Sequence, residues 1–193
     1  MRYNELTFQG RNAVLEAFRS GKTIDKLFIL DGCQDGPIKS IVREAKKTDA
    51  IINYVDKERL DRLAGTGHHQ GVVAIGAAYE YAEVEDILAA AKEKGEDPFI
   101  FILDEIEDPH NLGAIIRTAN LAGAHGVIIP KRRAVGLTAT VAKTSAGAIN
   151  YTPVAKVTNI SQTIEELKKQ GLWFVCADMG GETMYNLNLK GPI

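Results

Sequence analysis

The sequence predicts an α/β protein built from two successive parts, and three observations support this class. Short runs of strand-forming residues alternate with segments whose apolar residues recur at helical spacing. Strands separated by helices imply a parallel sheet covered on both faces, which is expected for the second part. An acidic, alanine-rich segment ending in Gly95-Glu96-Asp97-Pro98 lies between the two alternating blocks. The predicted division is a small α/β domain at 1–78, a helical connector at 79–97 and a second domain at 98–193.

The elements of the first block and the connector follow from apolar spacing and from helix-breaking residues. The expected helices cover 11–18, 38–47, 58–63 and 83–94, and the expected strands cover 26–30, 51–55 and 72–77. The connector helix has an apolar stripe formed by Val84, Ile87, Leu88 and Ala91, so it should pack against another element.

The second block alternates again between strands and helices. The expected strands cover 99–103, 126–129, 151–157 and 173–177, and the expected helices cover 111 to about 123, 138–146 and 160–170. Trp173 and Phe174 follow strand spacing and are expected in the core. No internal repeat and no low-complexity segment is present in the sequence.

Composition sets limits on the class of protein. The 193 residues are 45% hydrophobic and 25% charged, which is ordinary for a globular protein, and the formal net charge is −2. Residues 1–80 carry 12 basic and 11 acidic groups, 81–97 carry 2 and 6, and 98–193 carry 9 and 8. Any nucleic-acid contact must therefore come from local patches. No membrane span or signal-peptide core is found, and two distant cysteines, Cys33 and Cys176, indicate reduced thiols in a cytoplasmic protein without a metal site.

The most informative stretch is the transition from a strand to a helix within residues 99–120. Asn111 is expected to cap the helix, Gly113 leaves room at its first turn, and Arg117 follows one turn later. Open α/β sheets bind ligands where a strand delivers a polar turn to a helix N-terminus. The alternative interpretation is that Arg117 is an ordinary surface arginine and Asn111 only a cap. His110 is interpreted as a turn residue.

Two further segments carry candidate functional residues. Lys131-Arg132-Arg133 directly follows a predicted strand, where three positive charges suit phosphate contacts. A solvated charge run is the alternative. The segment Lys143 to Ala148 has small residues, including Ser145, that permit a close backbone approach. The glycines of the segment 65–71 do not match a nucleotide-binding loop, because a helix precedes them and a strand follows.

The spacing Asn-x-Gly-x-x-x-Arg at Asn111, Gly113 and Arg117 resembles the first motif of the SpoU class (TrmH-like) of RNA ribose 2′-O-methyltransferases, in the SPOUT trefoil-knot superfamily. The resemblance extends to other segments of the chain, namely Gly10 to Ala17, His69 to Ala74, Ala122 to Ile129 and Lys143 to Ala148. It implies an N-terminal RNA-binding domain of the L30e type, followed by a Rossmann-like SPOUT domain that is knotted when complete.

The resemblance also implies roles for individual residues. Arg117 is the implied activator of the 2′-hydroxyl, and Asn111 orients Arg117 or the ribose. The implied RNA-binding residues are Arg11, Asn12, Lys22, His68, Gly113, Lys131, Arg132, Arg133 and Ser145. The methyl donor is S-adenosyl-L-methionine, and Gly180 and Gly181 line one side of its pocket. The implied substrate is structured RNA, a guanosine of 23S rRNA by preference or else tRNA, so the family takes part in rRNA processing.

Two other functions remain open at this point. The chain could be a non-catalytic RNA-binding protein, or an enzyme acting on small molecules with a Rossmann-like sheet. Incorporation of a methyl group at a ribose oxygen of RNA would distinguish the methyltransferase from both of these alternatives. Two further motifs of the SpoU class are not found before Ile193. We therefore expect a C-terminally truncated chain that is itself inactive, from a protein that forms a homodimer at full length.

Overall fold

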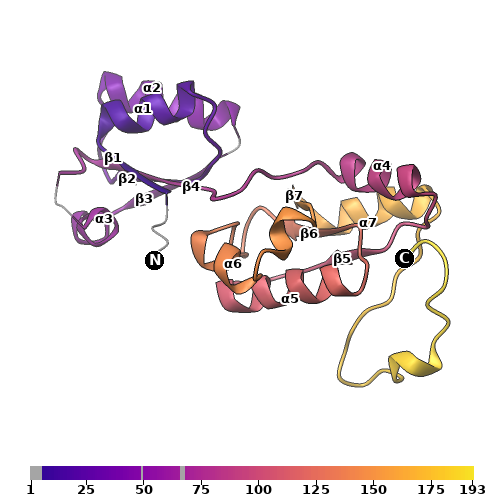
Figure 1. Ribbon diagram of the computed structural model, residues 1–193. Helices are drawn as coiled ribbons and strands as arrows, with labels where there is room; N and C mark the ends of the chain where they lie inside the picture. The colour runs from indigo at the N-terminus through magenta and orange to yellow at the C-terminus, as the bar shows by residue number, and fades with distance from the viewer. Residues whose placement is uncertain (1–5, 49, 66–67) are drawn as a thin grey trace. The chain divides into compact units, whose positions relative to one another are not determined.

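The computed structural model describes residues 6–48, 50–65 and 68–193 (Figure 1). The chain divides into two compact units. The first unit holds residues 1–80 together with 136–143, and the second holds 81–135 together with 144–193. The first unit therefore contains the predicted domain at 1–78 and also the later segment 136–143, which the prediction did not include. Residues 1–5, Asp49 and the pair 66–67 lie outside the described residues, so the predictions for the N-terminus and for part of the segment 65–71 are not described further.

The first unit is a four-stranded mixed sheet with helices on both faces. Its elements are β1 (Leu6–Gln9), α1 (Arg11–Arg19), β2 (Ile24–Leu30), α2 (Gly36–Lys47), β3 (Ile51–Val55), α3 (Lys57–Ala64) and β4 (Val72–Gly76). The strand order is β1-β4-β2-β3; β2 and β3 are parallel, and β4 is antiparallel to both β1 and β2. Strand β1 was not predicted, because its four residues give too short an apolar alternation to recognise.

Side chains alternate between the two faces of this sheet and build two apolar clusters. The larger cluster joins α1 and α2 to β2 and β4 through residues such as Val14, Leu27 and Ile41. The smaller one joins α3 to the opposite face through Phe28, Leu60 and Val73. Strand β3 lies at one edge of the sheet, beyond β2. This edge is important below because α2 runs along it.

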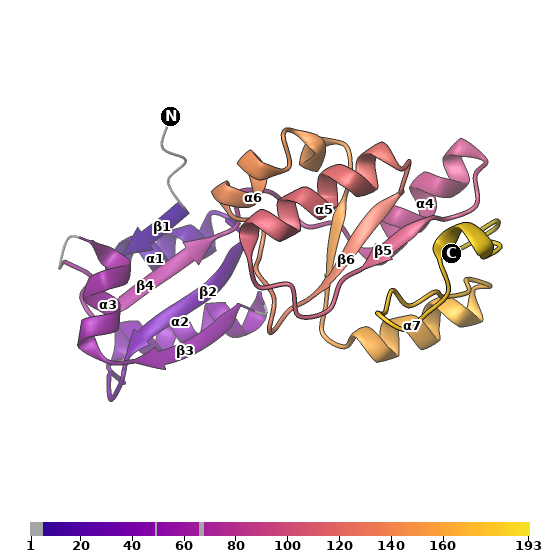
Figure 2. The same cartoon turned by 90° about the horizontal axis from the view of Figure 1, so that it is seen from below.

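The second unit contains a three-stranded parallel sheet with the order β5-β6-β7. The predicted α/β class with a parallel sheet is therefore confirmed. The elements after β4 are α4 (Val84–Lys94), β5 (Ile100–Ile102), α5 (Pro109–Leu121), β6 (Gly126–Pro130), α6 (Ala139–Thr144), β7 (Val154–Val157) and α7 (Ile160–Lys169), with short 3-10 helices at Ala148–Asn150 and Met184–Asn186. Figure 2 shows α5 and β6 from below the view of Figure 1.

The helices of this unit cover both faces of its sheet, as predicted. Ile128 of β6 packs with Ile87 of α4 and Leu167 of α7 in one apolar cluster. Val127 and Ile129 alternate to the opposite face and are equally buried. Figure 1 shows α5 on the side of the sheet away from α4. The predicted connector helix is therefore packed into the second unit as α4.

The last predicted strand, at 173–177, is wrong. This segment is not assigned to the sheet; instead the Trp173 amide donates to the Pro192 carbonyl at 3.1 Å. Both edges of the three-stranded sheet are already partly paired. Ala82 forms a bridge with Ala155 beside β7, and Ile193 exchanges two backbone hydrogen bonds with Pro98 and Ile100 beside β5. The segment 173–177 begins with a hydrogen bond to Pro192, next to Ile193 beside β5, and does not pair with β5 itself.

Two smaller details complete the second unit. Trp173 and Phe174 are partly buried, and Phe174 packs against the cluster around Ile128. The strand expected at 151–157 begins only at Val154, since Tyr151 follows a 3-10 turn and is 80% exposed. Across the described ranges, none of the helices has the length and apolar character needed to cross a membrane.

Candidate active site

The carboxyl ends of β5, β6 and β7 meet at one edge of the second sheet, because the three strands are parallel. Backbone hydrogen bonds hold the loops that follow them. The amide of Leu103 donates to Ile128 at 2.9 Å, and the amide of Lys131 donates to Val157 at 2.8 Å. The amide of Val135 donates to Ile106 at 2.9 Å. The predicted strand-to-helix turn and the basic segment are thus brought to the same edge.

Helix α5 is capped by Asp108 and not by Asn111, which corrects the sequence prediction. The Asp108 carboxylate accepts a hydrogen bond from the His110 amide at 2.7 Å, and Pro109 takes the first helical position, where no amide donor is needed. Asn111 instead lies in the first turn with its side chain exposed. His110, predicted as a turn residue, is exposed in the same turn. Asn111 is therefore available to a ligand and is not used as a cap.

Gly113 makes a close approach to its own chain. A Cβ added there would collide with the side chain of Thr144 and would lie 2.9 Å from the amide nitrogen of Ser145. Thr144 also donates a hydrogen bond from its hydroxyl to the Pro109 carbonyl at 3.2 Å. The prediction that Gly113 leaves room for a substrate backbone is wrong, because the end of α6 fills this space.

Arg117 lies on the outer face of α5, and its side chain is exposed. Among the residues that the structure describes, its guanidinium has no hydrogen bond or ion pair. Asn111 is six positions earlier, which places it about 120° away around the helix axis. No hydrogen bond joins the two side chains within the described ranges, so an orienting effect of Asn111 on Arg117 is not seen. The arrangement leaves an exposed cation on α5 without a partner among the described residues.

The basic segment follows β6 as predicted, but its three cations differ. Lys131 is partly buried and makes an interaction, whereas Arg132 is exposed and without an ion pair in the described part of the chain. Arg133 binds Glu105, with 2.7 Å between the guanidinium and the carboxylate. Glu105 and Arg133 both have a positive φ, near 56° and 57°. Glu105 was missed from the sequence, where it reads as part of an acidic turn.

Ser145 is fully buried, which corrects its prediction as a substrate-binding residue. Its carbonyl accepts a hydrogen bond from the Ala148 amide at 3.0 Å in the turn between α6 and the following 3-10 helix. A side chain without exposed surface cannot contact RNA while this turn is intact. The small residues of this segment are explained by the close approach of Gly113 described above.

Gly180 and Gly181 do not form a cradle for a cofactor in this structure. A Cβ added at Gly180 would meet no atom within 4 Å, and one at Gly181 would meet only the Asp178 carbonyl at 3.7 Å. Both glycines lie in the segment that leaves the sheet after Trp173 and returns at Pro192, drawn in yellow in Figure 1. The structure thus gives no support to these glycines as the wall of a pocket.

In the first unit, Arg11 has a structural position. Its guanidinium pairs with Asp35 at the start of α2, and its Nε donates to the Gln70 carbonyl at 3.2 Å. The Gln70 side chain in turn accepts from the Arg11 amide at 3.1 Å. Gly10 at the N-cap has no side chain to do this, so Gln70 caps α1 from a distant loop. The prediction of Arg11 as a freely available RNA contact is therefore corrected. The capping role of Gln70 was not predicted from the sequence.

The other three predicted RNA contacts of the first unit, Asn12, Lys22 and His68, are exposed. Beside His68, the buried side chain of His69 accepts the Gly71 amide at Nδ1 and contacts the Asp61 carboxylate through Nε2, both at 3.0 Å. An N–H donor at Nδ1 would clash with that amide, so the proton of the neutral ring is at Nε2. His69 is therefore committed to the fold, while His68 is free to contact a ligand.

Electrostatic features near the site are modest. The resolved pKa shift concerns Glu165 on α7, where the hydrogen bond and the charge of Lys168 lower the pKa of the carboxyl. Within the described ranges, no three His, Cys, Asp or Glu side chains are arranged to hold a metal ion. Arg117 and the basic segment therefore supply positive charge in this part of the unit, beside the exposed carboxylates of Asp104, Glu107 and Asp108.

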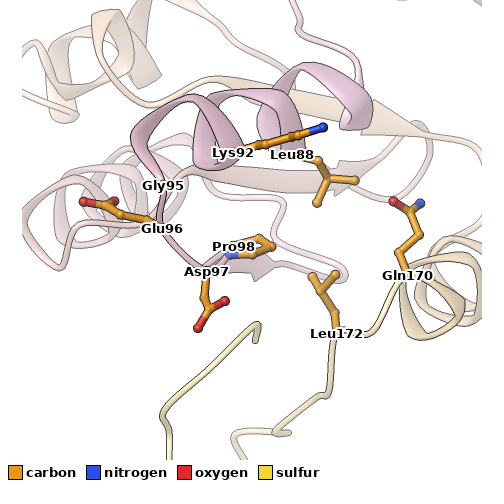
Figure 3. A pocket seen from close by; sticks show the side chains of 8 residues that line it. All are labelled: Leu88, Lys92, Gly95, Glu96, Asp97, Pro98, Gln170 and Leu172. Atoms are coloured by element: carbon orange, nitrogen blue, oxygen red, sulfur yellow. The ribbon is translucent and has the colours of Figure 1, made fainter.

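A cavity of about 420 Å³ lies at the opposite, amino edge of the second sheet (Figure 3). Figure 3 shows Leu88, Pro98 and Leu172 around an apolar centre, with the charged ends of Lys92, Glu96 and Asp97 turned outward. Nearby, the buried side chain of His125 accepts the Phe99 amide and binds the Glu96 carboxylate, each at 3.0 Å. None of the residues that line this cavity belongs to α5, the helix that carries Arg117.

The second unit is thus a parallel α/β sheet with an exposed arginine on α5, and a small α/β unit precedes it in the chain. Comparison with known families identifies the family to which this arrangement belongs. The profile of the SpoU rRNA Methylase family matches residues 98–193, and that of RNA 2′-O ribose methyltransferase substrate binding matches residues 9–82.

Individual relatives agree with these profiles. The chain is 54% identical over 185 residues to a putative TrmH family tRNA/rRNA methyltransferase, YacO, of Bacillus subtilis, covering 95% of this chain and 74% of the relative. It is 48% identical over 184 residues to a putative TrmH family tRNA/rRNA methyltransferase of Staphylococcus aureus, covering 95% and 73%. The chain belongs to the SpoU, or TrmH, family of RNA methyltransferases, which confirms the family predicted from its motifs.

Solved structures with similar folds are more distant. An AdoMet-bound rRNA methyltransferase from Sinorhizobium meliloti has a TM-score of 0.48 and 22% identity, covering 96% of this chain and 68% of that one. An RNA 2′-O ribose methyltransferase has a TM-score of 0.44 and 19% identity, covering 99% and 70%.

Proposed function

We propose that this protein transfers a methyl group from S-adenosyl-L-methionine to a ribose 2′-hydroxyl of structured RNA, with a guanosine of 23S rRNA favoured over tRNA. Membership of the SpoU family and the substrate-binding profile support the reaction and the RNA substrate. The observation that carries the proposal is the exposed guanidinium of Arg117 on α5, the helix that begins at the carboxyl edge of the second sheet. Among the described residues it has no hydrogen bond or ion pair.

The chemistry assigned to Arg117 is electrostatic. A guanidinium group keeps its proton near neutral pH, so it is a poor base. It can instead bind the phosphate next to the target ribose and draw electron density from the 2′-hydroxyl. Both effects hold the hydroxyl in place and make its proton easier to lose. The exposed Asn111 amide in the first turn of the same helix can hydrogen-bond the ribose.

S-adenosyl-L-methionine supplies the methyl group as a sulfonium donor. Gly180 and Gly181 were predicted to line its pocket, but the space around them is open, so the structure does not support that role. The second candidate function, which the sequence leaves open, is an RNA-binding protein without methyl transfer. Incorporation of the methyl group separates the two candidates directly.

The test maps ribose methylation in total RNA from cells with the intact gene, without it, or complemented with a variant. Arg117→Ala should leave RNA affinity nearly unchanged and reduce methylation of the target ribose at least a hundredfold, a change of about 2.7 kcal/mol in the barrier. Arg62→Ala removes an exposed arginine from α3 and serves as the matched control. If the gene changes no ribose methylation, the RNA-binding candidate is favoured; methylation above about a tenth of normal in Arg117→Ala would remove Arg117 from the chemistry.

Homodimer formation and a cytoplasmic location remain part of the proposal. Light scattering of the protein purified from its native source measures its mass and thus tests the homodimer. Fractionation of the same cells tests the cytoplasmic location.

A further inference from the structure

Helix α2 of the first unit carries a stripe of positive charge that is hidden in the overall composition. Lys39, Arg43 and Lys46 follow the spacing i, i+4 and i+7, so they share one face of the helix, with the first two about 6 Å apart along the axis. All three are exposed. Arg43 is 3.8 Å from Glu44, and no ion pair to Lys39 or Lys46 is present in the described part of the chain. These three residues are the basic stripe.

A groove of about 210 Å³ runs beside the basic stripe, between α2 and the edge strand β3. The residues that line it are Cys33, Gln34, Ile38, Lys39, Val42 and Tyr54. Lys39 belongs to both the groove and the stripe. Ile38 and Val42 make the floor apolar, while Tyr54 is 57% exposed at the edge of the sheet. An apolar slot with an aromatic wall thus lies next to a row of cations.

This combination fits one kind of ligand better than others. The groove is smaller than the roughly 300 Å³ at which pockets for whole small molecules begin, so it suits one part of a larger ligand. Proteins bind single-stranded nucleic acid with aromatic rings that stack on bases and with cations that follow the backbone. An acidic peptide would use the cations but not the exposed ring of Tyr54. A duplex keeps its bases stacked on one another and cannot offer one to the groove.

We propose that the Tyr54 groove and the basic stripe form a binding site for single-stranded RNA. One base stacks on Tyr54, and the adjoining phosphates lie along Lys39, Arg43 and Lys46. The inference rests on the proposed function and deepens it, since it locates the contact with the substrate RNA on the first unit. Loops, bulges and ends of a structured RNA present such unpaired bases.

The stacking contact is tested with the whole chain and a short labelled oligouridine at low salt. Tyr54→Ala should weaken binding about tenfold, as expected for loss of one stacked base, while Tyr54→Phe keeps the ring and should bind like the wild type. Tyr185→Ala removes a tyrosine of the second unit that is more exposed than Tyr54, at 87%, and serves as the control. A duplex of the same length should not distinguish Tyr54→Ala from the wild type. Equal urea midpoints show that the variants remain folded.

The phosphate contacts are tested by salt dependence. A variant with Lys39, Arg43 and Lys46 all changed to Gln should lower the slope of log affinity against log salt by about two units, near 0.7 for each phosphate on a single strand. The matched control changes Lys57, Arg59 and Arg62 to Gln, which removes the same charge from α3 on the other face of the sheet. Its slope should stay close to that of the wild type.

The two cysteines provide an independent readout in the unmodified protein. Cys33 lines the groove, whereas Cys176 is exposed in the second unit and serves as the reference thiol. Bound oligouridine should slow the alkylation of Cys33 relative to Cys176. Unchanged alkylation of Cys33 at saturating oligouridine would place the RNA elsewhere.

The outcomes separate this inference from the proposed function. If the wild type binds RNA and the Tyr54 and basic-stripe variants bind equally well, the groove is overturned and the methyltransferase proposal stands. If the wild type has no RNA affinity at low salt, the groove is overturned together with RNA as the substrate. If the groove variants behave as expected in a protein that methylates no ribose, the site stands and the proposed reaction falls.

Discussion

Two pairs of glycines, one pair in each unit, are required for different physical reasons. In the first unit, Gly10 and Gly71 have φ values of +88° and +82°, which side chains rarely tolerate. In the second unit, Gly113 and Gly126 have ordinary backbone angles, but a Cβ at either position would collide with a neighbour. The first pair is thus required by backbone conformation and the second by close packing. Alanine substitutions in the two pairs should therefore lower the stability of the fold for different reasons. A second substitution can relieve only the packing defect.

Gly113→Ala should have the largest effect on stability. The added methyl group meets Thr144 and the backbone of Ser145, and a backbone cannot move aside without shifting α6. We expect a loss of about 3 kcal/mol in the free energy of unfolding, at the upper end of the cost of overpacking. Urea unfolding of both variants measures it, with Ala114→Ser on the same helix as the control. A loss below about 1 kcal/mol would show that this contact is soft.

Gly126→Ala sharpens the comparison because its clash can be relieved. The added methyl group would meet only side-chain atoms of Ile87. We expect a loss of about 2 kcal/mol, and the double variant with Ile87→Val should recover part of it. The cycle of single and double variants gives the interaction energy. Additive losses in the double variant would contradict a direct contact between the two residues.

Gly10→Ala should cost about 2 kcal/mol by a mechanism that no partner relieves. With φ of 88° and ψ of 153°, this residue is in a region that only glycine populates readily. The nearest neighbour of an added Cβ is the Gln70 side chain at 3.3 Å, which is an ordinary if tight contact. Adding Gln70→Ala should therefore give no recovery, and it should further weaken the start of α1. Recovery in that double variant would make Gly10 a packing glycine like Gly126.

The buried histidines show where the two units agree. His69 and His125 each accept a backbone amide at Nδ1 and donate from Nε2 to a partly exposed carboxylate. Changing either histidine to Ala leaves a backbone amide without its partner, so each should lose about 1–2 kcal/mol. The carboxylate variants Asp61→Asn and Glu96→Gln should lose less, since water can replace the acid. Urea midpoints that differ strongly between the two histidine variants would break the parallel.

Surface ion pairs should give the smallest effects. Glu44–Lys47 on α2 and Glu165–Lys168 on α7 have the same i, i+3 spacing. Lys168 lowers the pKa of Glu165, so the stabilisation from that pair is present above the pKa of the unfolded chain and is lost as the pH falls through the folded value. Lys168→Gln should therefore shift the urea midpoint slightly at neutral pH and not in acid. A shift that persists in acid would indicate a contact other than the ion pair.

The sequence predicted most helices and strands because their apolar spacing is local information. Strand β1 and the loss of the strand at 173–177 depend on pairing between distant segments, which spacing does not contain. The site shows the same division. The position of Arg117 follows from its helix, whereas the cap at Asp108 depends on which residue reaches the amide of His110. The roles of Thr144, Glu105 and Gln70 arise from contacts across 31, 28 and 59 positions (Gly113 to Thr144, Glu105 to Arg133, Arg11 to Gln70), which no motif records.

The discontinuous first unit has a consequence for the way the protein is made. Its segment 136–143 follows more than fifty residues of the second unit, and the amide of Ala78 donates to the Leu137 carbonyl at 2.7 Å. Ribosomes add about 5–20 residues each second, so residue 80 is added about 3–11 s before residue 136. Until then the first unit lacks this segment, and the hydrogen bond between Ala78 and Leu137 forms only after synthesis has passed residue 143. Folding of the first unit during translation should therefore show two steps, although the last of its strands is β4. Residues 6–80 fold first, and the segment 136–143 is added later.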